Sequence, residues 1–115
     1  FEVLRTEQWH QLCKIFDKYD ALIAPTMARS AVPHGQSDED YDGLDAQGRY
    51  KGLDMTCPFN QVGQCPALSV PCGFSADGLP IGLQVVGHRF DDLTVMRIGA
   101  ALEEVLRLDQ ARPGI

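Results

Sequence analysis

Hydrophobic side chains near the start of the chain recur at spacings of three and four residues, which predicts a helix up to Lys18 with one apolar face. A short apolar run at residues 21–24 follows and predicts a buried strand. Pro25 ends the hydrogen bonding of this strand in our prediction, because proline has no backbone N–H to donate. The helix face would consist of Trp9, Leu12, Phe16 and Tyr19, with Ile15 beside them.

Two further hydrophobic runs, residues 67–74 and 81–86, predict strands in which alternate side chains share a face. The Asp77-Gly78 pair between them favours a turn. Because Pro80 also lies in the connection, we expect an antiparallel hairpin whose loop is longer than two residues. The shared faces would be formed by Leu68, Val70 and Cys72 in the first strand and by Ile81, Leu83 and Val85 in the second.

A final helix is predicted from Asp91 or Asp92, either of which can cap it, to about Leu108. Its hydrophobic residues form a broad stripe. Gly99 lies at the edge of that stripe, where the missing side chain would let another element approach closely. The stripe consists of Val95, Ile98, Leu102, Val105 and Leu106, widened by Ala101 and Leu108.

Residues 28–55 follow neither periodicity and contain Pro33, several glycines and an acidic run. We interpret them as a long, variable surface loop, of the kind that is often functional or mobile. The acidic run is interpreted as a solvated segment. A calcium site is the alternative, although the run lacks the full ligand spacing and the terminal glutamate of an EF-hand. The acidic residues are Asp38, Glu39, Asp40, Asp42 and Asp45.

The order of helix, strand, long loop, strand, strand and helix predicts an α/β fold with a mixed sheet flanked by helices. A sheet of three strands leaves at least one edge bare, and both helices have wide apolar faces. We therefore expect the chain to need partner surface, from the remainder of a longer protein or from a second copy in a homo-oligomer. The chain starts at Phe1, already inside the helical pattern. This start is typical of a piece of a longer protein, although a processed N-terminus would look the same.

Composition narrows the classes of function. The 115 residues fit one modest domain, and the net charge of -6 argues against nucleic-acid binding, which needs clustered Lys and Arg. No apolar run approaches the roughly 20 residues that cross a bilayer, and no signal peptide is visible. The four cysteines form no C-x-x-C pair and have no histidine at ligand spacing, so we expect no metal site. We interpret them as reduced thiols of a cytoplasmic protein, with two disulfides in a secreted protein as the alternative.

No catalytic set can be recognised in these residues alone. No G-x-S-x-G elbow surrounds a serine, no lysine lies in an apolar setting, and the glycines match no phosphate-binding or dinucleotide fingerprint. We therefore expect no catalytic residue in this chain and no cofactor. Cys72 is the most suggestive thiol, but we interpret it as a small apolar strand residue.

One stretch is more specific than these patterns. It reads TCPFNQVGQCPALSVPCG from Thr56 to Gly73, then GLPIGLQVVG from Gly78 to Gly87, with Phe90 opening an FDD run at the start of the final helix. An upstream YDALIAPT run precedes the loop. Together these runs resemble the closing third of amidase-signature enzymes, and the resemblance covers nearly the whole chain except the loop.

The resemblance implies that residues 1–115 are the C-terminal part of an amidase-signature domain. Enzymes of that family hydrolyse amides with a Ser nucleophile, a second Ser in a cis peptide and a Lys base. No Gly-Ser-Ser run here matches that set, so the catalytic residues would lie upstream and the isolated chain would be inactive. Thr56, Phe59 and Asn60 would contact a small-molecule amide substrate, with a bracing role for the Asn60 amide as the alternative.

Two other functions are compatible with the same resemblance. The amidase-type component of a tRNA-dependent amidotransferase shares this segment and passes the released ammonia to another component of its complex. The acidity of the loop disfavours tRNA contact through this piece. A non-catalytic interaction module built from the same fold segment is the alternative from a different class. An upstream Lys and Gly-Ser-Ser run would favour the enzyme over the module.

Overall fold

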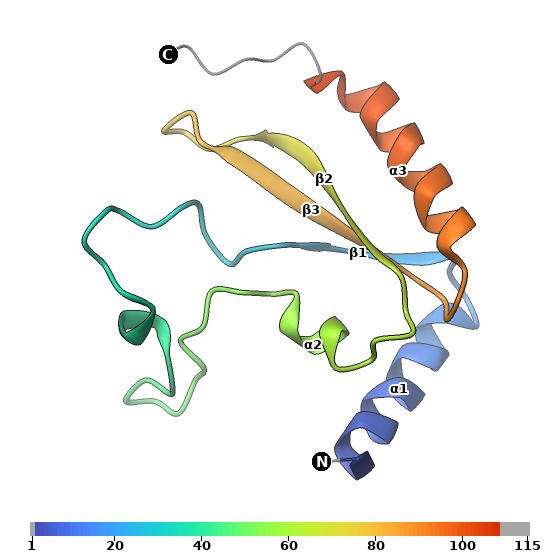
Figure 1. The fold of residues 1–115 in the computed structure, drawn as a ribbon, viewed down its shortest axis with the longest axis horizontal. Helices are drawn as coiled ribbons and strands as arrows, with labels where there is room; N and C mark the ends of the chain where they lie inside the picture. Colours follow the sequence, from blue (N-terminus) through green and yellow to red (C-terminus); the bar gives the residue numbers. More distant parts are fainter. Residues whose placement is uncertain (1, 109–115) are drawn as a thin grey trace.

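A computed structural model describes residues 2–108 (Figure 1). The predicted order of elements is confirmed, with a short 3₁₀ helix and a one-turn helix added between the first and second strands. The elements are α1 (Glu2–Phe16), β1 (Ala21–Pro25), the 3₁₀ helix η1 (Asp38–Tyr41), α2 (Cys57–Asn60), β2 (Ala67–Phe74), β3 (Pro80–Gly87) and α3 (Asp92–Leu106).

The three strands form one sheet in the order β1-β3-β2. In the central strand, Val86 pairs with Leu22 of β1 on one side and with Ala67 of β2 on the other. The α/β class with flanking helices is confirmed. We expected a mixed sheet, but both pairings among the described residues are antiparallel. Strands β2 and β3 are antiparallel because their connection is short, whereas a parallel pair needs a crossover of a dozen or more residues.

The hairpin has the expected long turn and an irregularity that we did not predict. The turn is closed by the Ser75 amide, which donates to the Leu79 carbonyl at 2.8 Å, and Gly78 adopts a φ of 77°. In β2, Pro71 pairs with Gly82 and Gly73 pairs with Ile81, so Cys72 is the extra residue of a β-bulge. A bulge suits this position because Pro71 cannot donate to the ladder. It also interrupts the alternation that would place Cys72 on the face of Leu68 and Val70.

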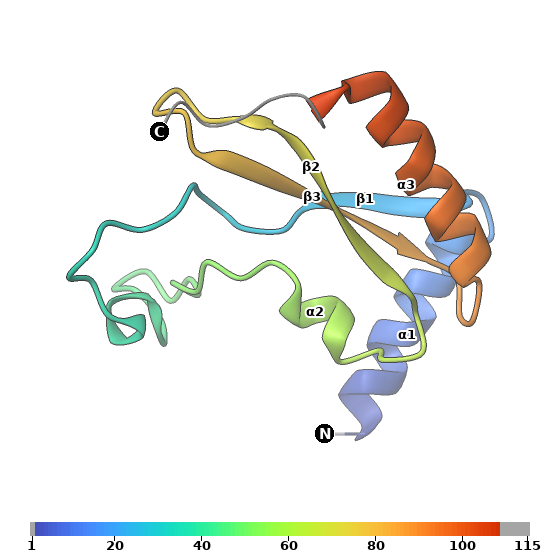
Figure 2. The ribbon, with the colours of Figure 1, turned by 45° about the horizontal axis from the view of Figure 1, so that its top comes forward.

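Helix α3 packs on β2 and β3 through most of the side chains that we expected in its stripe, Val95 first among them. Val85 of β3 is 0% exposed, and Val95 of α3 is 2% exposed. Gly99 is buried, and a Cβ added there would clash with Leu68 Cδ2, which confirms that the glycine allows close approach. Figure 2 shows α3 along one side of the sheet and α1 and α2 toward the other.

The opposite face of the sheet carries a second hydrophobic cluster. Val86 lies next to Val85 in the strand, so its side chain points to the other face, and it is also 0% exposed. The central strand is therefore covered on both sides at this end. The cluster consists of Leu12, Val62, Cys65 and Val86, with Trp9, Ile15, Phe16, Leu22 and Phe59 packed against it.

Both long helices end earlier than predicted, and residues that we placed on their apolar faces are exposed. Helix α1 ends at Phe16, so Tyr19 lies beyond the helix and is 64% exposed instead of joining its apolar face. Helix α3 ends at Leu106, and Val105 is 79% exposed. Val105 lies about 80° around the helix axis from Val95, because each residue turns the helix by about 100°, and this places it past the edge of the stripe. Ala101 is exposed for the same geometric reason.

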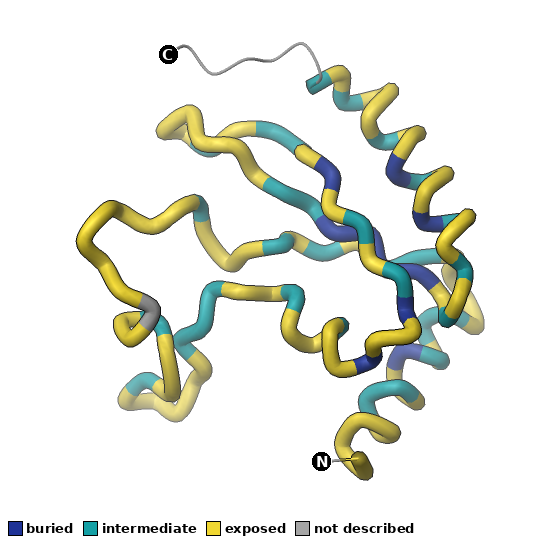
Figure 3. Tube along the Cα trace, in the orientation of Figure 1, coloured by how far each residue is buried: buried dark blue, intermediate teal, exposed yellow. Residues whose placement is uncertain are grey.

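The loop at 28–55 is largely exposed, as Figure 3 shows, although it contains η1 and an isolated bridge between Leu44 and Tyr50. The molecule is flat, with extents of 45 × 42 × 18 Å. Its radius of gyration is 16.2 Å, whereas a self-contained domain of this length would have about 13 Å. More large hydrophobic side chains are exposed than buried among the described residues. The fold is therefore open, in agreement with the expected need for partner surface.

Candidate functional site

The α2 segment, residues 53–60, is organised by the carboxylate of Asp54. Its Oδ1 atom accepts hydrogen bonds from the Thr56 amide at 2.7 Å and from the Thr56 hydroxyl at 2.6 Å. Its Oδ2 atom accepts from the Cys57 thiol at 3.3 Å. Hydrogen bonds from the Thr56 side chain and amide, and then from Cys57, hold the pKa of Asp54 below its ordinary value. Asp54 is therefore a charged acceptor at neutral pH that fixes the start of α2.

The structure brings together two of the three predicted substrate-binding residues. The Asn60 side-chain amide donates to the Thr56 hydroxyl at 3.3 Å, and the Asn60 backbone amide donates to the Thr56 carbonyl at 3.1 Å. Thr56 thus links the carboxylate of Asp54 to the amide of Asn60. Phe59 lies apart from this pair, because it packs against the hydrophobic cluster that contains Leu12 and Val86.

The segment is tied to the end of β1 by backbone hydrogen bonds. The Met55 amide donates to the Thr26 carbonyl at 3.0 Å, and the Ala28 amide donates to the Leu53 carbonyl at 2.8 Å. Met27 and Asp54 form an isolated antiparallel bridge between these two bonds. Residues 53–55 therefore extend the line of β1 as a short antiparallel pair.

Gln84 of β3 joins the α2 segment to the end of β1 by buried hydrogen bonds. Its side chain is 2% exposed, and its Nε2 atom donates to the Pro25 carbonyl and to the Met55 carbonyl, each at 2.9 Å. Neither Gln84 nor Asp54 was predicted from the sequence. A glutamine inside the apolar run of a strand was the available signal for Gln84, since buried amides are almost always hydrogen-bonded.

A hollow of ≈ 490 Å³ lies beside the segment, between α2 and the loop. Asp54 and Cys57 line it from the α2 side. The rest of the wall combines apolar and aromatic side chains with acidic ones, a mixture that suits a small polar ligand with a hydrophobic part. These other lining residues include Met27, Val32, Glu39, Tyr41, Asp42, Tyr50 and Leu53.

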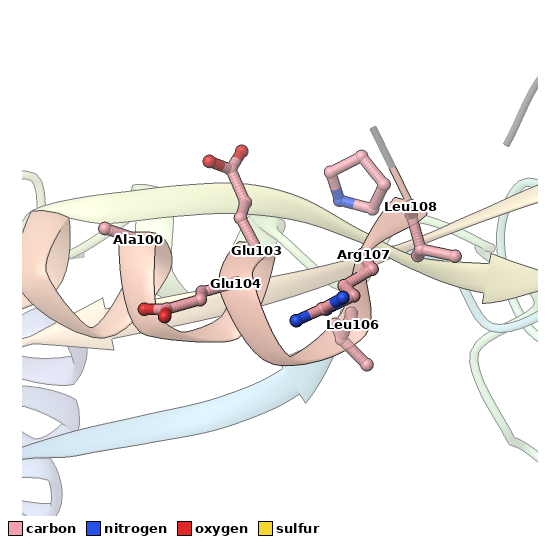
Figure 4. A pocket seen from close by; sticks show the side chains of 7 residues that line it. Ala100, Glu103, Glu104, Leu106, Arg107 and Leu108 are labelled. Atoms are coloured by element: carbon pink, nitrogen blue, oxygen red, sulfur yellow. The ribbon is translucent and has the colours of Figure 1, made fainter. Parts of the chain in front are cut away.

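Two other hollows lie elsewhere on the surface. One of ≈ 640 Å³ is lined by residues 26–32 and 80–82, next to the end of β1. The other, of ≈ 620 Å³, lies at the C-terminal end of α3 (Figure 4). It is lined by Pro71 and by Ala100, Glu103, Glu104, Leu106, Arg107 and Leu108, and it shares no residue with the α2 segment.

The thiols in the described residues are all free. The hydrogen bond to the Asp54 carboxylate raises the pKa of the Cys57 thiol, and burial raises that of Cys65. A raised pKa leaves a thiol protonated and weakly nucleophilic at neutral pH. Cys72, which we interpreted as a strand residue, is half-buried at the bulge.

The histidines form no nucleophile–base pair within residues 2–108. His88 contacts the edges of Trp9 and Phe16, with ring centroids 6.0 and 5.8 Å away. His10 and His34 are exposed, and no histidine in this part of the chain hydrogen-bonds to a serine, threonine or cysteine side chain. The same residues contain no group of three or more His, Cys, Asp or Glu that could hold a metal ion. They also contain no helix long and apolar enough to cross a membrane.

Sequence relatives of the chain are components of an amidotransferase. It is 38% identical over 100 residues to the A component of the glutamyl-tRNA(Gln) amidotransferase of Oceanobacillus iheyensis, and 39% identical over 99 residues to that of Bacillus velezensis. These alignments cover 87% and 86% of the chain but 19% of the length of each relative. The chain therefore spans a small part of the curated relatives that it matches.

The chain also matches a part of larger proteins of known structure. The chain superposes on 6-aminohexanoate cyclic dimer hydrolase with a TM-score of 0.74 and 31% identity, over 96% of this chain and 24% of that one. It superposes on a bacterial aryl acylamidase of the amidase-signature family with a TM-score of 0.72 and 31% identity, over the same shares. The sequence model of the family described as Amidase matches residues 2–96. The chain therefore belongs to the amidase-signature family.

Proposed function

We propose that the protein hydrolyses carboxamide C–N bonds by the Ser-cisSer-Lys mechanism, with the catalytic residues in a part of the enzyme upstream of this chain. The observation that carries the proposal is the superposition of 96% of the chain on two solved amide hydrolases. The residues of the chain support this placement of the catalytic residues, because no serine, threonine or cysteine side chain in residues 2–108 is hydrogen-bonded to a histidine or a lysine. No cofactor is required by this chemistry.

The α2 segment would form one wall of the substrate site. Thr56 and Asn60 are the proposed contacts, since their side chains lie together and carry donors and acceptors suited to an amide. Phe59, which we also expected to contact the substrate, would act by anchoring the segment to the core cluster. The adjacent hollow would hold the acyl part of a small-molecule amide, and the loop around it would set selectivity.

The remainder of the amidase domain is the proposed partner of the chain. It would cover the two open sheet edges and the exposed hydrophobic side chains. A homo-oligomer that covers the same surfaces is the alternative.

The test compares this chain alone with the longer polypeptide that would supply the remaining strands, using an aryl acylamide and a simple aliphatic amide as substrates. The longer polypeptide should release amine, and its Thr56→Ala and Asn60→Ala variants should lose turnover, whereas an exposed control variant, Gln11→Ala, should not. The chain alone should release none. Turnover by the chain alone would show that the catalytic residues do not lie upstream.

The amidotransferase relatives favour a second function, in which ammonia released from an amide is passed to another component of a complex. This alternative predicts that turnover by the longer polypeptide rises when the other components and tRNA are added. A non-catalytic interaction module predicts no turnover in either case.

A further inference from the structure

Gln84 is an unusual residue for its position. It occupies the middle of the central strand, and the two residues that follow it, Val85 and Val86, are fully buried. Burying a side-chain amide costs roughly 1–3 kcal/mol unless the amide is hydrogen-bonded, so an apolar residue would be the simpler choice for packing. A glutamine here is therefore expected to do something that a leucine could not.

The amide of Gln84 joins two segments that are distant in the sequence. One partner, the Pro25 carbonyl, belongs to the end of β1, and the other, the Met55 carbonyl, belongs to the residue before Thr56. These partners lie 59 and 29 residues from Gln84. A single NH₂ group thus uses both of its hydrogens to hold the α2 segment against the sheet.

The Met55–Thr56 peptide unit is consequently fixed from both sides. Its carbonyl oxygen accepts from Gln84 Nε2 at 2.9 Å, and its N–H donates to Asp54 Oδ1 at 2.7 Å. Rotation of this planar unit would break both bonds at once. Since the unit leads directly into Thr56, its orientation determines where the Thr56 hydroxyl and the Asn60 amide point.

The other links between the segment and β1 are more accessible to water. Met27 is 46% exposed and Met55 is 37% exposed, so water can compete for the backbone bonds of this pair. The Gln84 bonds lie in a buried environment, where a hydrogen bond is electrostatically stronger. Gln84 is therefore the interior link of the segment to the sheet.

We propose that Gln84 is a positioning residue, which orients the Met55–Thr56 peptide and through it the substrate-contacting side chains of the α2 segment. The substrate part of this inference rests on the proposed function, whereas the link itself does not. The two parts can be tested separately, because backbone protection can be measured in this chain without any turnover.

The first test measures amide hydrogen exchange in the full chain by NMR, with rates divided by their intrinsic values at each pH. In the Gln84→Leu variant, protection of the Met55 and Thr56 amides should fall on the order of tenfold, the effect of losing about 1.4 kcal/mol of hydrogen bonding. Protection of the Ser75 amide in the β2–β3 turn should fall much less. The control variant Gln64→Leu, which removes an amide bonded to Arg89 away from the segment, should leave Met55 and Thr56 unchanged.

The Gln84→Glu variant separates hydrogen bonding from packing. A carboxylate has the same shape but no hydrogen to donate, so protection of Met55 and Thr56 should be lost at neutral pH. It should return in part at low pH, where the protonated carboxyl can donate to one of the two carbonyls. Unchanged protection in the Gln84→Leu variant would overturn the link, as would an equal fall at Ser75, or no recovery of the Gln84→Glu variant at low pH.

The second test uses the longer polypeptide with an aryl acylamide as substrate. The Gln84→Leu variant should raise KM or lower kcat several-fold, while the Gln64→Leu variant should change neither. If backbone protection falls but turnover is unaffected, the link is correct and the substrate role of the α2 segment is wrong. If protection is unaffected, the positioning role itself is wrong.

Discussion

Two valines on α3 offer a direct test of which face of this helix supports the fold. Val95 is 2% exposed and Val105 is 79% exposed, although both lie in the hydrophobic stripe predicted from the sequence. Replacing each with alanine makes the same chemical change in the same helix. The difference between the two effects therefore measures burial.

The expected magnitude follows from what Val95 contacts. Its Cγ2 atom lies well within van der Waals contact distance of the position that a Cβ of Gly87 would take, so it packs directly against the backbone of β3. The Val95→Ala variant loses about 1.6 kcal/mol for two buried methyl groups, and on the order of 1 kcal/mol more for the cavity left behind, because a glycine backbone has no side chain to fill it. The better helix propensity of alanine offsets about 0.5 kcal/mol, so the net loss of unfolding free energy is about 2 kcal/mol.

The Val105→Ala variant keeps only the propensity term and should change the unfolding free energy by less than about 0.5 kcal/mol, in the stabilising direction. Urea titration followed by circular dichroism and by the fluorescence of the single tryptophan measures both variants. If the unfolding free energy falls by about 2 kcal/mol for each molar increase in urea, the urea concentration at the unfolding midpoint should be about 1 M lower for the Val95→Ala variant. Equal midpoints for the two variants would refute the assignment of faces.

Four further predictions concern the packing, the pH dependence, the loop and the association state. The Gly87→Ala variant should lose about 1–3 kcal/mol in urea titrations, because its Cβ would clash with the side chain packed above it, whereas Gly63→Ala, with no atom nearer than 3.7 Å, should be nearly neutral. Hydrogen bonds from Thr94 hold the pKa of the helix cap Asp91 below its ordinary value, so its stabilising effect is present above the unfolded pKa of about 3.9 and lost as the pH falls through the folded pKa. The melting temperature of the Asp91→Asn variant should therefore fall less between pH 7 and pH 3 than that of the original protein. An equal fall in both proteins would contradict the role of Asp91 as a helix cap. Residues 28–55 should exchange amide hydrogens faster than any strand, and slow exchange throughout them would rule out a mobile loop. In sedimentation at micromolar concentration the isolated chain should associate, so a dilute, cooperatively unfolding monomer would show that it closes its own core.

The sequence predicted the features that depend on neighbouring residues. The strand at 67–74 and a helix cap at Asp91 or Asp92 follow from local patterns, and the structure confirms the strand and places the cap at Asp91. Gly99 was also predictable, since a glycine in an apolar stripe indicates close approach. Local patterns carry this information because helix and strand periodicities repeat within a few residues.

The features that were missed depend on contacts between distant parts of the chain. Nothing near Gln84 in the sequence reveals that its partners are carbonyls in β1 and before α2. The width of the stripe that the sheet covers on α3 depends on tertiary packing, so the hydrophobic pattern alone placed Val105 inside the stripe although its side chain is exposed. The organising role of Asp54 was hidden for the same reason, because it lies at the end of a loop whose path is set by its pairing with the continuation of β1.

The pairing of β1 with β3 joins Ala21 to Gly87 and so closes a long stretch of chain, whereas β2, β3 and α3 follow one another directly. The entropy lost on closing such a stretch grows only with the logarithm of its length, and doubling a flexible loop costs about 0.6 kcal/mol. Residues can therefore be inserted into or deleted from 29–52, between the paired residues at the two ends of the loop, at little expense to the equilibrium stability of the sheet. The same long closure predicts that β1 docks later in folding than the local contacts of β2, β3 and α3 form.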